Sequence, residues 1–225
     1  MSRPAICIKP QKLNIESLEI REPKVYKPRD INLSIKTSEI LYRNNKGELC
    51  DLYITLPQIE TYGPSPINTF NSKIKSKENI QGYTISYSHL DVEKMFDSIH
   101  DDFQNKINEI INNCKLKPIF NYRKKLENNL KVDDKSKPKV AYLKLKISKD
   151  CKIIETKMYD PNSKQLIDPI DTISKFGLIK PMIHMSNIYF GSHGNSGYSA
   201  SVQVKLVKAY FQQISSELPD FPDEE

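Results

Sequence analysis

A single stretch of this chain has the apolar spacing of a helix, and that stretch constrains the fold more than any other feature. Between Leu90 and about Leu116 the apolar residues recur every three or four positions, which is the period of one amphipathic helix. Ser88 and Asp91 form a candidate capping box at its start, and Pro118 is expected to end it. The fold class therefore depends on the segments before and after this helix.

Those flanking segments alternate between apolar and polar residues, as strands do. Strands are predicted at residues 13–15, 18–20, 31–35, 52–56, 83–87, 140–147, 152–159, 165–167, 178–190 and 198–207. The turn at 44–47 is expected to close one hairpin, and the last two strands form a second, longer hairpin. In residues 140–147, Lys144 and Lys146 are expected to face outward and the apolar residues inward.

Strands, one helix and further strands follow one another in the order of an OB-type barrel. We therefore predict an α+β fold, mostly β with one long helix, in which an OB-type barrel is elaborated by extra hairpins. Residues 1–216 are expected to form a single OB-fold-like domain, followed by an acidic disordered C-terminal tail at 217–225. This division follows the charge, because the tail holds five acids and no base, which leaves 34 bases against 23 acids in residues 1–216.

The basic residues are concentrated in one central segment. Residues Lys115 to Lys152 contain thirteen bases and four acids, a net charge of +9 in 38 residues. Basic charge at this density suits a polyanionic partner. The alternative interpretation is a solvated, lysine-rich surface without a partner.

Aromatic residues lie beside lysines on several predicted strands. The chain has twelve Tyr, eight Phe and no Trp. Single-stranded nucleic acid offers phosphates that pair with lysines and bases that stack on such rings, and each stacked base contributes about 1–3 kcal/mol. The alternative for each ring is a place in the core or at its rim. Residues 1–216 are therefore expected to be a nucleic-acid-binding domain. The residues predicted to bind DNA are Arg123, Lys139, Tyr142, Lys144, Lys146, Lys152, Tyr189, Phe190 and Tyr198.

Other chemistry has weaker support in the sequence. There is no glycine-rich phosphate loop with the lysine it requires, and the four histidines and four cysteines have no zinc-ligand spacing. Asp150, Glu155 and Lys157 offer the carboxylates and lysine of a divalent-metal nuclease, which stays open as an alternative. We predict no catalytic residue, no metal and no cofactor.

The chain is expected to be intracellular and not embedded in a membrane. Its longest uncharged run, between Lys180 and Lys205, is rich in Ser, Asn, His and Gly, which a lipid-spanning helix would not carry at that density. The N-terminus has no apolar stretch of signal-peptide length. The four cysteines lie far apart without a CxxC pair, which fits a reducing compartment.

Two segments carry a family resemblance. Residues 177–211 read GLIKPMIHMSNIYFGSHGNSGYSASVQVKLVKAYF, and residues 218–225 read LPDFPDEE. Both resemble the single-stranded DNA-binding proteins of phages and nucleocytoplasmic large DNA viruses, a family of OB-fold replication proteins. The resemblance implies a non-catalytic protein that acts in viral DNA replication, recombination and repair at the replication site in the host cell.

The resemblance also assigns a role to the tail. Acidic tails that carry a Phe recruit polymerases and helicases in such proteins and compete with DNA for the basic groove. It therefore implies that a polymerase, helicase or primase binds Asp220, Phe221, Asp223, Glu224 and Glu225. Homodimerisation stays open, and the alternative function is a virion or scaffold interaction protein without nucleic-acid binding.

Overall fold

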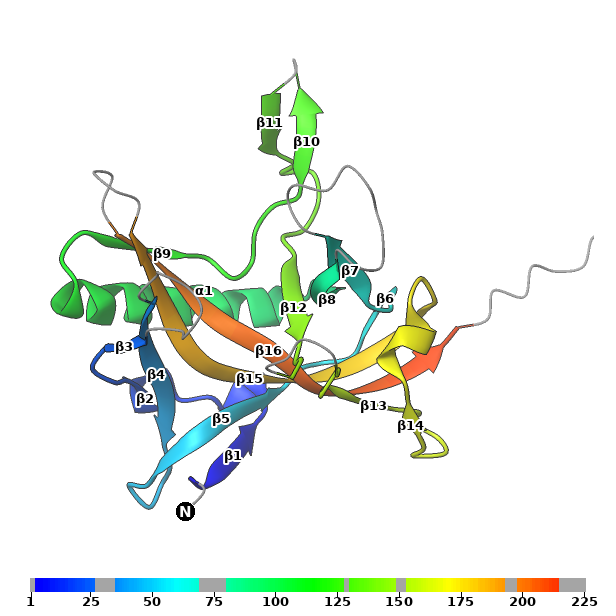
Figure 1. Cartoon of the computed structure of the whole chain (residues 1–225), viewed down its shortest axis with the longest axis horizontal. Coiled ribbons are helices and arrows are strands. Elements are labelled where there is room, and N and C mark those ends of the chain that lie inside the picture. The colour runs from blue at the N-terminus through cyan, green and yellow to red at the C-terminus, as the bar shows by residue number, and fades with distance from the viewer. Residues whose placement is uncertain are drawn as a thin grey trace, which may run out of the picture.

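A long antiparallel hairpin forms the spine of the fold (Figure 1). Its two strands are β15 (Phe176–Ser192) and β16 (Tyr198–Gln213). The predicted hairpin at 178–190 and 198–207 is confirmed, and both strands extend further than their sequence pattern indicates. The computed structural model describes residues 3–26, 35–68, 80–127, 130–148, 153–192 and 198–214.

Each outer edge of the spine pairs with three strands in succession. From its base to its tip, β15 pairs with β6 (Ile59–Tyr62), β5 (Leu49–Thr55) and β4 (Ile35–Arg43). In the same direction, β16 pairs with β13 (Lys157–Tyr159), β12 (Ala141–Leu145) and β9 (Cys114–Lys117). Strands from distant parts of the chain are thus held together by β15 and β16.

Shorter strands extend this sheet, which has fourteen strands within the described residues. They are β1 (Ala5–Ile8) on β5, β2 (Leu18–Ile20) and β3 (Lys24–Tyr26) on β4, β8 (Ile80–Tyr87) on β12, β7 (Ser65–Asn68) on β8, and β14 (Leu166–Ile167) on β13. A separate hairpin is formed by β10 (Lys124–Glu127) and β11 (Leu130–Asp133). The fold is therefore mostly β with one α-helix, as predicted, but the described strands do not close into a barrel.

The first half of the chain matches its sequence pattern only in part. The turn at 44–47 closes the hairpin of β4 and β5, where Gly47 has a φ of 80° that glycine adopts without steric cost. The strand predicted at 13–15 is wrong, because the Asn14 side chain accepts a hydrogen bond from the Glu16 backbone N–H and a short 3-10 helix forms at Ile15–Ser17. Two further 3-10 helices lie at Pro10–Lys12 and Pro169–Thr172.

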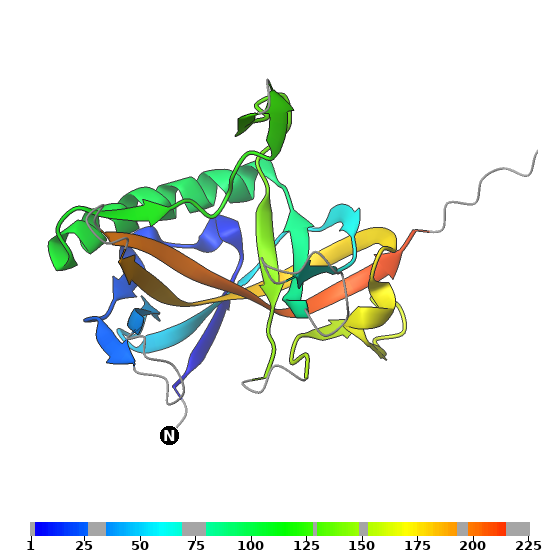
Figure 2. The same ribbon diagram turned by 45° about the horizontal axis from the view of Figure 1, so that its top comes forward.

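The helix α1 (Leu90–Ile110) covers one side of the sheet (Figure 2). Its buried residues recur every three or four positions and belong to the same hydrophobic core as the buried residues of the sheet. They are Val92, Phe96, Ile99, Phe103 and Ile107. This element therefore confirms the amphipathic pattern. Within the described ranges, no helix combines the length and the apolar character that crossing a membrane requires.

Both ends of the helix differ from the prediction. The helix stops six residues early, because Asn113 has a left-handed φ of 58° and Cys114 and Leu116 bury alternate positions of strand β9 instead. At the start, Ser88 does not cap the helix. Its hydroxyl donates a hydrogen bond to the carbonyl of Lys139 at 2.8 Å.

The strand register assigns the side chains of the spine to two faces. Ile183 lies opposite Leu206, and both are buried in the core. The next pair, His184 opposite Lys205, points to the other side. We call the core-facing side of the sheet the inner face and the opposite side the outer face.

Candidate nucleic-acid interface

Strands β9 and β12 present lysines on the outer face of the sheet. In β9 the exposed residues are Lys115 and Lys117, which alternate with buried residues. In β12 the exposed residues are Tyr142 and Lys144, and Lys146 follows in the same alternation. The predicted outward direction of Lys144 and Lys146 is therefore confirmed.

The register on β16 brings these two strands to the same surface. Lys117 pairs with Ser201 and Lys144 pairs with Lys205, so all of them point to the outer face. We call this surface the lysine face and define it by Lys115, Lys117, Tyr142, Lys144, Lys146 and Lys205.

A hollow lies on the lysine face where the edge of β16 that faces away from β15 has no strand beside it among the described residues. Pairing with β9 ends at Ser201 and pairing with β12 begins at Lys205, so residues 202–204 lie between the two strands. The hollow has a volume of about 220 Å³. It is lined by Lys117, Pro118, Ile119, Tyr142, Lys144, Ser201, Val202, Gln203 and Val204. Two lysines and an exposed tyrosine ring thus border an open strand edge.

The positive charge of this surface is largely uncompensated. Within the described part of the chain, Lys115, Lys117, Lys144 and Lys205 have no ion-pair partner, whereas Lys146 pairs with Glu155 at 2.7 Å. A polyanion would therefore meet lysines that need not first break an ion pair.

His184 lies opposite Lys205 and is influenced by the positive charge of the lysine face. Its ring stacks on Tyr53 with centroids 4.6 Å apart, and its Nε2 atom is buried without a described hydrogen-bond partner. Burial lowers the pKa of His184 below its usual value. Asp51 opposes this shift, while Lys205 and Lys146 add to it.

A second basic and aromatic cluster lies on the outer face at the base of the spine. Lys208 lies over both Tyr159 and Tyr210, 4.9 and 5.1 Å from the ring centroids, and Lys164 lies 5.1 Å from that of Tyr210. Lys208 and Tyr210 are not among the residues predicted from the sequence. Their pattern could have identified them, because both alternate with the buried Ala209 and Phe211.

Of the predicted aromatic residues, Tyr142 and Tyr189 lie on the outer face. Phe190 does not, because consecutive strand residues point to opposite faces and its side chain is only 7% exposed in the core. The prediction that Phe190 stacks on a base is therefore wrong. Tyr198 is exposed, but it lies on the same side of β16 as the buried Ala200, which is the inner side.

The predicted basic residues are also divided. Lys139 forms ion pairs with Glu93 and Asp97 of α1, at 3.0 and 3.4 Å, so its charge is already neutralised by the helix. The pKa of Lys139 is raised, chiefly by its hydrogen bond to Glu93. Lys139 is therefore engaged by α1 and is not one of the lysines without an ion pair, and its assignment to DNA binding stays a prediction. Arg123 is exposed and directly precedes β10, the first strand of the hairpin that projects from the sheet (Figure 1).

Other predicted site residues lie outside the described residues. These are Lys152 and the tail residues Asp220, Phe221, Asp223, Glu224 and Glu225. Of the alternative nuclease residues, Asp150 also lies outside, while Glu155 is engaged by Lys146. Within the described residues, no three His, Cys, Asp or Glu side chains are grouped so that they could hold a metal ion.

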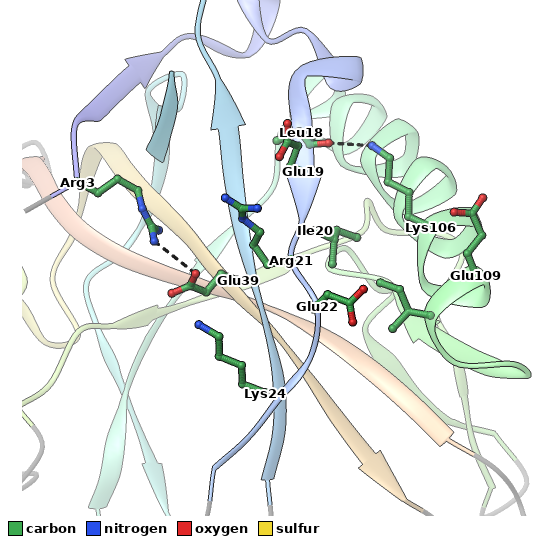
Figure 3. Close-up of a pocket in the computed structure, with 11 residues that line it drawn as sticks. Arg3, Leu18, Glu19, Ile20, Arg21, Glu22, Lys24, Glu39, Lys106 and Glu109 are labelled. Atoms are coloured by element: carbon green, nitrogen blue, oxygen red, sulfur yellow. Dashed lines mark hydrogen bonds and ion pairs between the residues drawn. The ribbon is translucent and has the colours of Figure 1, made fainter. Parts of the chain in front are cut away.

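A larger hollow of about 680 Å³ lies between β2, β4 and α1 (Figure 3). Its lining contains four cations and four anions, among them Arg3, which pairs with Glu39 at 3.4 Å. Lys106 donates a hydrogen bond to the carbonyl of Leu18 at 2.9 Å. Because its charges balance, this hollow is less suited to a polyanion than the lysine face.

Comparison with protein-family models and with curated proteins gives no match for this chain. The resemblance of residues 177–211 and 218–225 to viral single-stranded DNA-binding proteins therefore stays a prediction. The geometry of the lysine face is then the main ground for inferring a function.

Proposed function

We propose that this chain is a non-catalytic single-stranded DNA-binding protein that acts in viral DNA replication, recombination and repair. The observation that carries the proposal is the lysine face, where lysines without described ion pairs surround an exposed tyrosine and a hollow at an open strand edge. Extended sheet surfaces with this combination bind single strands by pairing phosphates with lysines and stacking bases on rings.

Each component of the lysine face has a place in this function. Lys117 and Lys144 lie on opposite sides of the hollow and would pair with phosphates on the two sides of one bound segment. Tyr142 is 57% exposed, so most of its ring is free to stack on a base between them. Ser201 and Gln203 of β16 also line the hollow and offer hydrogen bonds to sugars or base edges.

We further propose that the sheet is an elaborated OB-type fold and that the acidic tail recruits replication proteins. The order of strands, one helix and strands supports the first part, although the described strands form no closed barrel. The charge supports the second, because a segment with five acids follows a strongly basic body and would bind its basic surface when DNA is absent.

The test is a fluorescence anisotropy titration with labelled oligo-dT and with a duplex of equal length, each with and without magnesium. We expect tighter binding of oligo-dT, no cleavage, and a slope of log affinity against log salt of about −2 or steeper. The single variants Lys117→Ala and Lys144→Ala should each bind oligo-dT more weakly, and the double variant more weakly still. The matched control is Lys94→Ala, which removes an exposed lysine from α1 instead.

The outcomes separate the candidate functions. Binding that is absent, or that does not change with salt, would contradict the proposal and favour an interaction protein of a virion or scaffold. Magnesium-dependent cleavage of either substrate would favour the nuclease alternative. Equal weakening by the control would show that total charge, and not the lysine face, determines affinity.

A further inference from the structure

The hairpin of β10 and β11 projects from the rest of the molecule (Figures 1 and 2). Its two strands pair only with each other among the described strands. Its base is fixed beside β12, because Asn121 and Val140 exchange two backbone hydrogen bonds of 3.1 and 2.8 Å. We call the described residues 123–127 and 130–137 the finger.

The finger exposes apolar side chains on both of its faces. Leu126 is 74% exposed and Leu130 is 67% exposed. Leu126 lies opposite Lys131 and Leu130 lies opposite Glu127, so neighbouring positions place the two leucines on opposite faces. Two-stranded hairpins are only marginally stable in water without a covered face, so a partner that covers these leucines would stabilise the finger. A partner that buried one flat face would leave the other leucine exposed.

The finger also carries an excess of positive charge. Its sequence holds six bases and three acids. Each acid pairs with a neighbouring lysine, in the pairs Lys124–Asp133, Lys125–Glu127 and Lys137–Asp134. Within the described residues Arg123, Lys131 and Lys135 are left without an ion-pair partner. The finger is therefore a basic ribbon with an apolar residue on each face near its tip.

We propose that the finger enters a groove of duplex nucleic acid that adjoins the single strand on the lysine face. The major groove of B-form DNA, about 12 Å wide, admits a two-stranded β-ribbon, and its two walls would contact both faces of the ribbon. Thymine methyl groups in this groove make apolar contacts, and the phosphates on either side of it would pair with the basic side chains of the finger that have no ion-pair partner. The inference rests on the proposed function. It predicts that a junction between single-stranded and duplex DNA is the preferred ligand.

The experiment compares two labelled ligands: oligo-dT alone and the same oligo-dT joined to a duplex stem. The wild-type protein should bind the tailed stem at least about tenfold more tightly, a difference of about 1.4 kcal/mol. The variant Leu126→Ser/Leu130→Ser should lose this preference and keep its affinity for oligo-dT. The matched control is Leu166→Ser, since Leu166 is also 67% exposed but lies on β14, away from the finger.

A charge variant adds a second measurement. Lys131→Ala removes one unpaired cation, so the salt slope for the tailed stem should become less steep by about 0.9, while that for oligo-dT stays the same. Circular dichroism of each variant should match the wild type, because the replaced side chains are exposed.

Each result has one interpretation. If the tailed stem and oligo-dT bind equally well, or the double variant keeps the preference, the finger proposal is refuted while the proposed function stands. Binding of the stem without binding of oligo-dT would refute the proposed function and leave the duplex contact of the finger supported. If the double variant changes a dimer into a monomer without altering DNA affinity, the finger is a contact between copies and the proposal is refuted.

Discussion

Replacing Tyr142 by Ala is the most direct test of base stacking on the lysine face. The side chain is on the outer face of β12 and 57% exposed, so its removal leaves the core intact. If the ring stacks on one base, the variant should lose about 1–3 kcal/mol of binding free energy, a roughly fivefold to 150-fold weaker affinity. Tyr142→Phe keeps the aromatic ring and should bind nearly as wild type.

The assay is an anisotropy titration with oligo-dT at fixed low salt, accompanied by urea unfolding of each variant. Tyr142→Ala should change the free energy of unfolding by no more than about 0.5 kcal/mol. Phe190→Ala provides the contrast, since removing this buried ring should cost about 3–5 kcal/mol of stability.

Tyr62→Ala is the matched control for binding. Tyr62 is similarly exposed but lies on β6, on the other side of the spine, with its ring against Phe176. If Tyr142→Ala is folded and binds oligo-dT as tightly as the wild type, the stacking argument is refuted. The same conclusion follows if Tyr62→Ala weakens binding equally.

Three further predictions concern charge. The double variant Lys117→Ala/Lys144→Ala should make the salt slope for oligo-dT less steep by about 0.7 for each phosphate that is no longer neutralised, and an unchanged slope would remove both lysines from the binding surface. Deleting residues 217–225 should raise the affinity for oligo-dT at low salt and have less effect at high salt, because salt screens the attraction between the tail and the basic body. Equal affinities of the full-length and the shortened chain at low salt would contradict this competition. The pKa of His184 is lowered in the folded state, so near and below the usual histidine pKa of about 6.5 the unfolded chain binds more protons than the folded one. The free energy of unfolding should therefore decrease as the pH falls below about 6.5. Urea unfolding at several pH values should show this decrease, and His184→Gln should make it smaller.

Local periodicity correctly predicted the elements whose apolar pattern fits only a helix or only a strand. Helix α1 and the alternation of β12 belong to this class. The end of the helix does not, because Cys114 and Leu116 are compatible with both a helical and a strand pattern. Only pairing with β16, more than eighty residues away, selects the strand.

Which of the predicted residues lie together at the candidate site depends on contacts between distant parts of the chain, which a sequence does not show. Lys139 looks like its neighbours in composition, but the arrangement of α1 places Glu93 and Asp97 beside it. Strand alternation alone separates Tyr189 from Phe190, because they are consecutive strand residues and only one of them can face outward. For Tyr198, the sequence groups it with Ala200 but does not say which side the helix covers.

The spine also determines when the molecule can fold during synthesis. Of the strands beside it, those from residues 35–62 pair with β15 and those from residues 114–159 pair with β16, and both spine strands leave the ribosome later. Until then their edges stay unpaired and open to association with other chains. Contacts so distant in sequence are slow to form. A premature stop before residue 176 would therefore leave every strand beside the spine with at least one unpaired edge, and we expect such a fragment to aggregate.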